Sequence, residues 1–292
     1  MMDLEVCGSG ASSQPKNTGF IKQCLDEGMI SSYLTLEDFE ATRAEIVDEA
    51  FIKQAIQDKK IAVMFGVDEA PEDTSTEDEY QEGLRGKEKI KDGIPSLKTT
   101  HWLGLCSHSA MKSYTDSSFT REIRVLNDGK IRGTIKSNGK YAGIKLSSLN
   151  VENRIDPVVG TSTGKTVVER QYEDLTELED NAFVIQPEYN AKQLKGIFDV
   201  TLTADAVNSN AVSVAATLGC GGDNVKTLVL ADFVLKDSTG STKTITSATY
   251  NTATNKYDIV GASIVATDTI EINGVVSSGI NIYEGIEPVT LV

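Results

Sequence analysis

The spacing of hydrophobic positions changes along the chain, and each change indicates a different kind of element. In residues 36–60, apolar side chains recur near helical spacing at Phe39, Val47, Phe51 and Ala55, with Ile52 and Ile56 beside them. Thr35 and Asp38 at the start of this segment have the spacing of a capping box. The pattern therefore predicts one helix that begins after Thr35.

The segments on either side of this helix lack its periodicity. Residues 1–34 are mixed in composition and rich in Gly, Ser and Asn, which favours an extended arm with one short helical or strand-like piece near 20–25. After the helix comes a short apolar run at 61–67. Residues 68–82 then carry many acids and no base, a pattern typical of a loop.

The middle of the chain alternates apolar and polar residues, as strands do. Residues 90–100 and 119–135 show this alternation, and Asn127, Asp128 and Gly129 stand where a hairpin turn is expected. Residues 101–114 instead place apolar side chains on one helical stripe. Two further alternating runs, 141–150 and 165–172, complete an α+β region built on an antiparallel sheet.

The composition shifts after about Gly196. The remaining residues are rich in Ser and Thr, contain no Arg or His, and alternate with Val, Ile, Leu and Ala in short runs. Strand-like runs spaced about ten residues apart are the pattern of a small β-sandwich, and Asn255 marks one of its turns. The sequence thus predicts a mainly β protein with an α+β N-terminal part and a second, smaller sandwich domain.

Charge and composition narrow the possible functions. The chain has 292 residues, 28 Lys+Arg and 43 Asp+Glu, so its net charge is −15, which argues against binding duplex DNA through a basic face. No apolar run approaches the roughly 20 residues needed to cross a bilayer, and the first residues lack a signal-peptide pattern, so we expect synthesis in the cytoplasm. Four separated cysteines, Cys7, Cys24, Cys106 and Cys220, favour reduced thiols.

Candidate catalytic motifs fail on spacing. Gly160 and Gly164-Lys165-Thr166 are one residue too close for a phosphate-binding loop, and a strand pattern follows them instead of a helix. His101, Cys106 and His108 could supply zinc ligands or a nucleophile pair, but residues five and two apart lie on different sides of a helix. We therefore predict no catalytic, cofactor-binding or metal-binding residue, and no enzyme activity.

An acidic block and a basic block adjoin each other between residues 68 and 91. A solvated loop is the simpler interpretation, and the absence of EF-hand spacing argues against a Ca²⁺ site. The alternative is contact between subunits, in which the acidic block of one copy meets the basic block of the next in head-to-tail fashion. The residues assigned to this contact are Asp73, Glu77, Asp78, Glu79, Arg85, Lys87, Lys89 and Lys91. A later acidic run, 173–180, is interpreted as a solvated face or loop.

The order of elements resembles that of virion structural proteins of tailed phages. The segments that carry the resemblance are NDGKIRGTIKSNGKYAGIKLSSLNV at 127–151 and LKGIFDVTLT at 194–203. The resemblance is strongest to the tail-tube group, in which a β-sandwich flanked by a helix is followed by an Ig-like domain. After the N-terminal arm, placed at 1–34, it implies a tail-tube-like α+β domain at 35–195 with an antiparallel, barrel-forming sheet and flanking helices, and an Ig-like β-sandwich at 196–292. The N-terminal extension itself is a departure from a minimal tail-tube subunit.

The resemblance also implies a function without a cofactor. The chain would join other copies of itself in a hexameric ring, and stacked rings would form a conduit in which DNA is passing cargo. Its other partners would be virion proteins and not a membrane, and the chain would be made in the host cytoplasm and end in the virion. Two alternatives remain open: a capsid decoration or head–tail connector protein, and a surface carbohydrate-binding module.

Overall fold

The computed structural model describes residues 4–6, 27–83, 86–160, 163–173, 175–279 and 281–292. The chain divides into two compact units, Met1–Leu194 and Lys195–Val292, here called the first and second unit. The division lies one residue before the domain start expected at residue 196. Strands make up 47% of the structure and helices 13%, so the protein is mainly β, as predicted.

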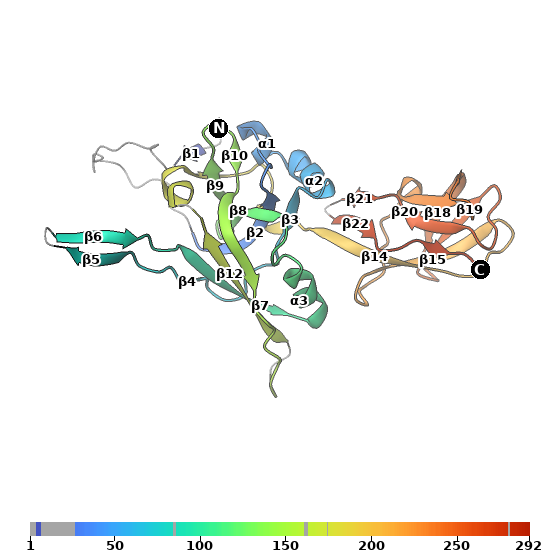
Figure 1. Ribbon diagram of the computed structural model, residues 1–292. Coiled ribbons are helices and arrows are strands. Elements are labelled where there is room, and N and C mark those ends of the chain that lie inside the picture. The colour runs from blue at the N-terminus through green and yellow to red at the C-terminus, as the bar shows by residue number, and fades with distance from the viewer. Residues whose placement is uncertain (1–3, 7–26, 84–85, 161–162, 174, 280) are drawn as a thin grey trace. The chain divides into compact units, whose positions relative to one another are not determined.

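The first unit is built on a curled sheet that forms about half of a barrel (Figure 1). Its strands follow the order β1-β13-β9-β8-β11-β12-β7-β4, with β10 beside β9, β2 beside β8, and β3 beside β2, and every pairing is antiparallel. The strands are β1 (Leu4–Val6), β2 (Met29–Leu36), β3 (Ile61–Val63), β4 (Glu72–Asp73), β7 (Ser96–Leu103), β8 (Phe119–Leu126), β9 (Ile131–Ile135), β10 (Tyr141–Ala142), β11 (Ile144–Val151), β12 (Gly164–Tyr172) and β13 (Ala182–Ile185).

The N-terminal segment predicted to be extended, 1–34, includes residues that belong to the sheet. Met29–Leu36 forms strand β2, which pairs with both β8 and β3 and is buried over most of its length. Only strand β1 and residues 27 and 28 are otherwise described within the predicted arm, and the short element expected near 20–25 lies outside the described residues. The alternation in Met29–Leu36 is interrupted by Ser31 and Ser32, which hid the strand from the pattern.

The long helix predicted after Thr35 is two short helices, and Thr35 belongs to β2. The helix α1 (Arg43–Val47) begins at Thr42, whose side chain accepts from the Glu45 backbone N–H while Glu45 accepts from the Thr42 backbone N–H. At Asp48 the backbone is extended, and the Asp48 carboxylate caps α2 (Glu49–Gln57). The capping box is therefore at Thr42, because a second cap interrupts the helical period at Asp48.

The helix predicted for residues 101–114 is also shorter than expected. The strand β7 continues through Leu103, so His101 and Trp102 lie in the sheet, and α3 covers Leu105–Lys112 after an extended Gly104. Later in the chain a π-helix, η1 (Thr176–Asp180), and a 3₁₀ turn, η2 (Ala191–Gln193), flank β13. By contrast, the turn predicted at Asn127–Gly129 is confirmed: Gly129 has a φ of 88° between β8 and β9.

The second unit is a sandwich of two sheets around one apolar core. The larger sheet has the order β18-β19-β15-β14-β22-β21 and the smaller one β17-β16-β20-β23, with a 3₁₀ turn η3 (Leu230–Asp232) before β16. The strands are β14 (Ile197–Ala204), β15 (Ala211–Leu218), β16 (Phe233–Lys236), β17 (Thr242–Lys243), β18 (Ile245–Asn251), β19 (Lys256–Gly261), β20 (Thr269–Ile272), β21 (Val275–Ser278), β22 (Asn281–Gly285) and β23 (Val289–Thr290). The predicted turn residue Asn255 has a φ of 55° between β18 and β19.

One glycine of the first unit is required by close packing. A Cβ at Gly133 in β9 would lie 2.5 Å from the Ala142 carbonyl oxygen and 2.7 Å from the Phe183 ring. We expect Gly133→Ala to lower the free energy of unfolding of the first unit by about 3 kcal/mol, because a backbone atom cannot yield as a side chain can.

Urea unfolding followed by the fluorescence of Trp102, the only Trp in the chain, tests this expectation. The matched control is Gly104→Ala, where a Cβ meets no atom within 4 Å and φ is −66°. Equal midpoints for the two variants would contradict the packing argument.

Candidate interaction surfaces

The acidic and basic blocks fold back on each other as a two-stranded hairpin. The strand β5 (Glu79–Gly83) pairs antiparallel with β6 (Gly86–Lys91), and neither is hydrogen-bonded to another strand. Figure 1 shows this hairpin projecting from the first unit, and we call residues 79–91 the arm. The prediction that 68–82 is entirely a loop is thus wrong for β4 and β5. An isolated two-stranded hairpin is marginally stable in water, so packing against a partner would stabilise the arm.

The charges assigned to a subunit contact partly neutralise each other within the chain. Lys89 Nζ lies 2.7 Å from Asp78 Oδ2 and also pairs with Asp92, while Lys91 Nζ lies 3.8 Å from Glu79 Oε1. The hydrogen bond from Lys89 lowers the pKa of Asp78 below its ordinary value. These pairs between the acidic and basic blocks form inside one copy, and the contact between subunits stays a prediction.

The remaining assigned residues differ in their surroundings. The Asp73 carboxylate accepts from the backbone N–H of Ser75 at 2.9 Å, and Glu77 is exposed. Arg85 lies outside the described residues. Lys87 is exposed near the end of the arm, and no described residue forms an ion pair or hydrogen bond with its ammonium group. Among the described basic residues of the arm, Lys87 is thus the one whose charge remains unmatched.

The arm also exposes two large apolar side chains. Tyr80 is 57% exposed and Ile90 is 59% exposed. Tyr80 lies opposite Lys89, and Glu82 lies opposite Lys87. Because alternate residues of a strand point to the same side, Tyr80 and Lys87 share one face of the arm, about 7 Å apart along it.

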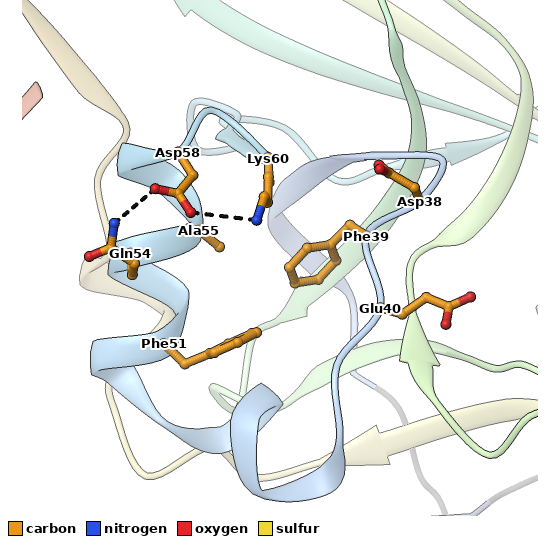
Figure 2. A pocket seen from close by; sticks show the side chains of 8 residues that line it. All are labelled: Asp38, Phe39, Glu40, Phe51, Gln54, Ala55, Asp58 and Lys60. Atoms are coloured by element: carbon orange, nitrogen blue, oxygen red, sulfur yellow. Dashed lines mark hydrogen bonds and ion pairs between the residues drawn. The ribbon is translucent and has the colours of Figure 1, made fainter. Parts of the chain in front are cut away.

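A surface pocket lies between α2 and the loop that follows β2 (Figure 2). Phe39 and Phe51 lie inside it with their ring centroids 6.3 Å apart. At its mouth, Asp58 accepts from Gln54 at 2.8 Å and pairs with Lys60 at 3.5 Å. The cavity measures about 180 Å³ and is lined by Asp38, Phe39, Glu40, Phe51, Gln54, Ala55, Asp58 and Lys60.

The two other carboxylates of the pocket differ in their pairing. Glu40 points away from Phe51 in Figure 2 and is paired with Lys136 at 2.9 Å and with the Asn138 amide at 2.9 Å. Asp38 is exposed and makes no hydrogen bond or ion pair with any described residue. The mouth of the pocket therefore carries one unmatched negative charge beside an aromatic floor. The sequence prediction missed this pocket because one of its walls is the loop after β2, whose residues had been predicted to belong to the helix.

The histidines and cysteines considered for metal or nucleophile chemistry have separate structural partners. His108 hydrogen-bonds to the Thr166 hydroxyl at 2.9 Å, and His101 is buried in β7. Cys106 and Cys220 are each disulfide-bonded, so the prediction of reduced thiols is wrong for these two; Cys7 and Cys24 lie outside the described residues. Within the described residues, no cluster of three His, Cys, Asp or Glu side chains could hold a metal ion.

A buried polar network crosses the sheet of the first unit. Arg170 on β12 donates from Nε to Glu122 on β8 and from Nη1 to the Thr99 hydroxyl at 2.7 Å. The Tyr172 hydroxyl donates to the other Glu122 oxygen at 2.6 Å. Burial opposes ionisation of Glu122, but the charges of Arg170 and Arg124 outweigh it and lower its pKa. The carboxylate is therefore held ionised inside the core.

His101 extends this network to the backbone beyond β3. Its Nδ1 lies 2.8 Å from the Gly66 carbonyl oxygen, and its Nε2 lies 2.9 Å from the Thr99 hydroxyl. A carbonyl oxygen can only accept, so Nδ1 carries the proton and Nε2 accepts from Thr99. Burial, together with the charge of Arg170, lowers the pKa of His101. This neutral histidine is a structural residue of the core.

The acidic run after β12 is only partly solvated. Glu177 accepts from Arg121 at 3.0 Å, and the Arg121 guanidinium is buried and also paired with Glu37. The interpretation of 173–180 as a solvated face or loop is therefore wrong for Glu177. As predicted, a strand and not a helix follows the glycine-rich segment: β12 begins at Gly164, and Lys165 pairs with Glu69 at 2.9 Å.

Among the described helices, none has the length and apolar character required to span a membrane. No protein-family model matches the chain, and no curated protein is significantly similar to it.

Proposed function

We propose that this chain is a structural subunit of a tailed-phage virion, a tail-tube or tail-ring protein whose copies join into a ring that forms a conduit for DNA. The observation that carries the proposal is the open, curled antiparallel sheet of the first unit, together with an arm whose two strands pair only with each other. A half-barrel has edges, and neighbouring copies can cover them by continuing the sheet.

The chemistry of the described residues supports an assembly role. Each buried charged side chain of the described residues forms an ion pair within the chain, and the pocket described above is smaller than the roughly 300 Å³ at which small-molecule sites begin. A net charge of −15 per copy suits a conduit wall, because negative walls repel phosphates and DNA slides without adhering. Disulfides at Cys106 and Cys220 suit a particle that is released into an oxidising medium.

A carbohydrate-binding role for the second unit has less support. Sugar rings stack on exposed aromatic side chains. The exposed large apolar residues described for the second unit are all aliphatic. They are Val229, Leu230, Val260, Val265, Ile286 and Val292. A decoration or connector protein remains the alternative within the virion.

Negative-stain electron microscopy of the full-length protein, from low to high concentration, tests the proposal. Rings or tubes are the expected result. Uniform monomers at high concentration that also fail to join rings with the neighbouring virion proteins would overturn it. Symmetric rings that stay separate would favour a tail-ring or connector position over a stacked tube.

A further inference from the structure

The arm and the pocket beside α2 match each other in size and charge. The pocket has an aromatic floor of Phe39 and Phe51 and a volume of about 180 Å³, which suits one side chain. Its mouth carries the unmatched carboxylate of Asp38. The arm presents an exposed aromatic side chain, Tyr80, and an unmatched ammonium, Lys87, on one face.

The two surfaces lie on different sides of the first unit. Figure 1 shows the arm leaving the first unit on the side away from α2. A contact between them therefore joins two copies through different surfaces, which gives a head-to-tail arrangement that closes into a ring or continues as a filament.

We propose that the arm of one copy docks on the pocket beside α2 of a second copy, with Tyr80 packed against Phe39 and Phe51 and Lys87 beside Asp38. This inference rests on the proposed function, since it names the surfaces through which the copies join. An aromatic anchor in an apolar pocket supplies most of the affinity in such contacts, and the charge pair fixes the orientation. Lys60 stays with Asp58, which leaves Asp38 as the carboxylate that receives the incoming lysine.

Sedimentation velocity of the full-length protein, over a range of concentrations at low salt, measures the contact. We expect Tyr80→Ala to weaken association about tenfold through loss of the aromatic anchor, and Lys87→Glu or Asp38→Lys to weaken it about tenfold through repulsion. The matched control is Lys226→Glu, an exposed lysine of the second unit, which should change association by less than about twofold.

Two combinations separate docking from damage to the fold. The double variant Lys87→Glu/Asp38→Lys reverses the charge pair and should recover most of the lost association, which a misfolded arm would not. An equimolar mixture of Tyr80→Ala and Asp38→Lys contains one intact arm and one intact pocket, so it should stop at complexes of two copies.

The outcomes distinguish this inference from the proposed function. If the unmodified protein associates and Tyr80→Ala, Lys87→Glu and Lys226→Glu all associate equally well, the docking inference is overturned and the structural role stands. The same holds if the double variant is no better than either single variant. If the unmodified protein stays monomeric at every concentration and with its virion neighbours, the proposed function fails and the docking inference fails with it.

Discussion

Replacing Arg170 by methionine should lower the free energy of unfolding of the first unit by about 3–5 kcal/mol. The substitution removes the cation but leaves Glu122, which is fully buried, as an uncompensated charge. It also removes the donor that Arg170 supplies to Thr99. Breaking a buried pair from one side is costly because the remaining ion keeps its desolvation penalty and loses its partner.

Urea unfolding followed by Trp102 fluorescence measures this loss, because Trp102 lies on β7, which pairs with Arg170's strand β12 in the same sheet as β8. The control is Glu122→Gln/Arg170→Met, which removes both charges and leaves an amide oxygen to accept from Tyr172. This double variant should recover at least half of the loss. A single variant within about 1 kcal/mol of the unmodified protein would show that Glu122 takes up a proton or reaches water at little cost.

Acidification from pH 6.5 to pH 5 should destabilise the first unit through His101. In the unfolded chain a histidine has a pKa of about 6.5, whereas burial and Arg170 lower the pKa of His101 in the fold. Above pH 6.5 both states are neutral at this position and stability is unaffected. Below it the unfolded state binds the proton first, so stability falls by up to about 1.4 kcal/mol per pH unit until the lowered folded pKa is reached.

Unfolding curves at pH 7.5, 6.5, 5.7 and 5.0 test this dependence in the unmodified protein, His101→Gln and His108→Gln. We expect the slope to flatten most in His101→Gln, because His101 is the histidine inside the network with Arg170. The pKa of His108 is also lowered by burial and by Lys112 and Arg154, so His108→Gln should flatten the slope less. An unchanged slope in His101→Gln would assign the acid sensitivity to other groups.

Local chemistry was enough to predict several parts of this fold. The turn at Asn127–Gly129 and the turn at Asn255 follow from residues that tolerate positive φ. The alternating runs predicted most strands of the second unit but not β22 and β23. A two-residue turn or an alternating strand depends on its own residues, so a single sequence carries the information.

The remaining features depend on contacts that sequence spacing does not contain. At Asp48 an N-cap interrupts a helical period that continues on both sides, and at Leu103 strand pairing with β12 overrides an apolar stripe. Glu122 and Arg170 occupy inward positions of their strands, where apolar residues are expected. These charged residues at inward positions were the sequence signal of the buried pair. The pocket beside α2 could be predicted only with the end of β2 known, because its floor joins Phe39 from the loop after β2 with Phe51 from the helix.

Among the described strand pairs of the second unit, the one parallel pairing has a mechanical consequence. The strand β14 opens this unit, and β22 lies near its end; they run in the same direction from Ile197 opposite Ile282 to Val200 opposite Gly285. A pull that draws the start and the end of the unit apart slides these strands past each other in shear. The ladder bonds lie across the pull and share the load, so they must break together instead of one by one. Strand order thus gives the unit resistance to tension that its thermodynamic stability alone would not reveal.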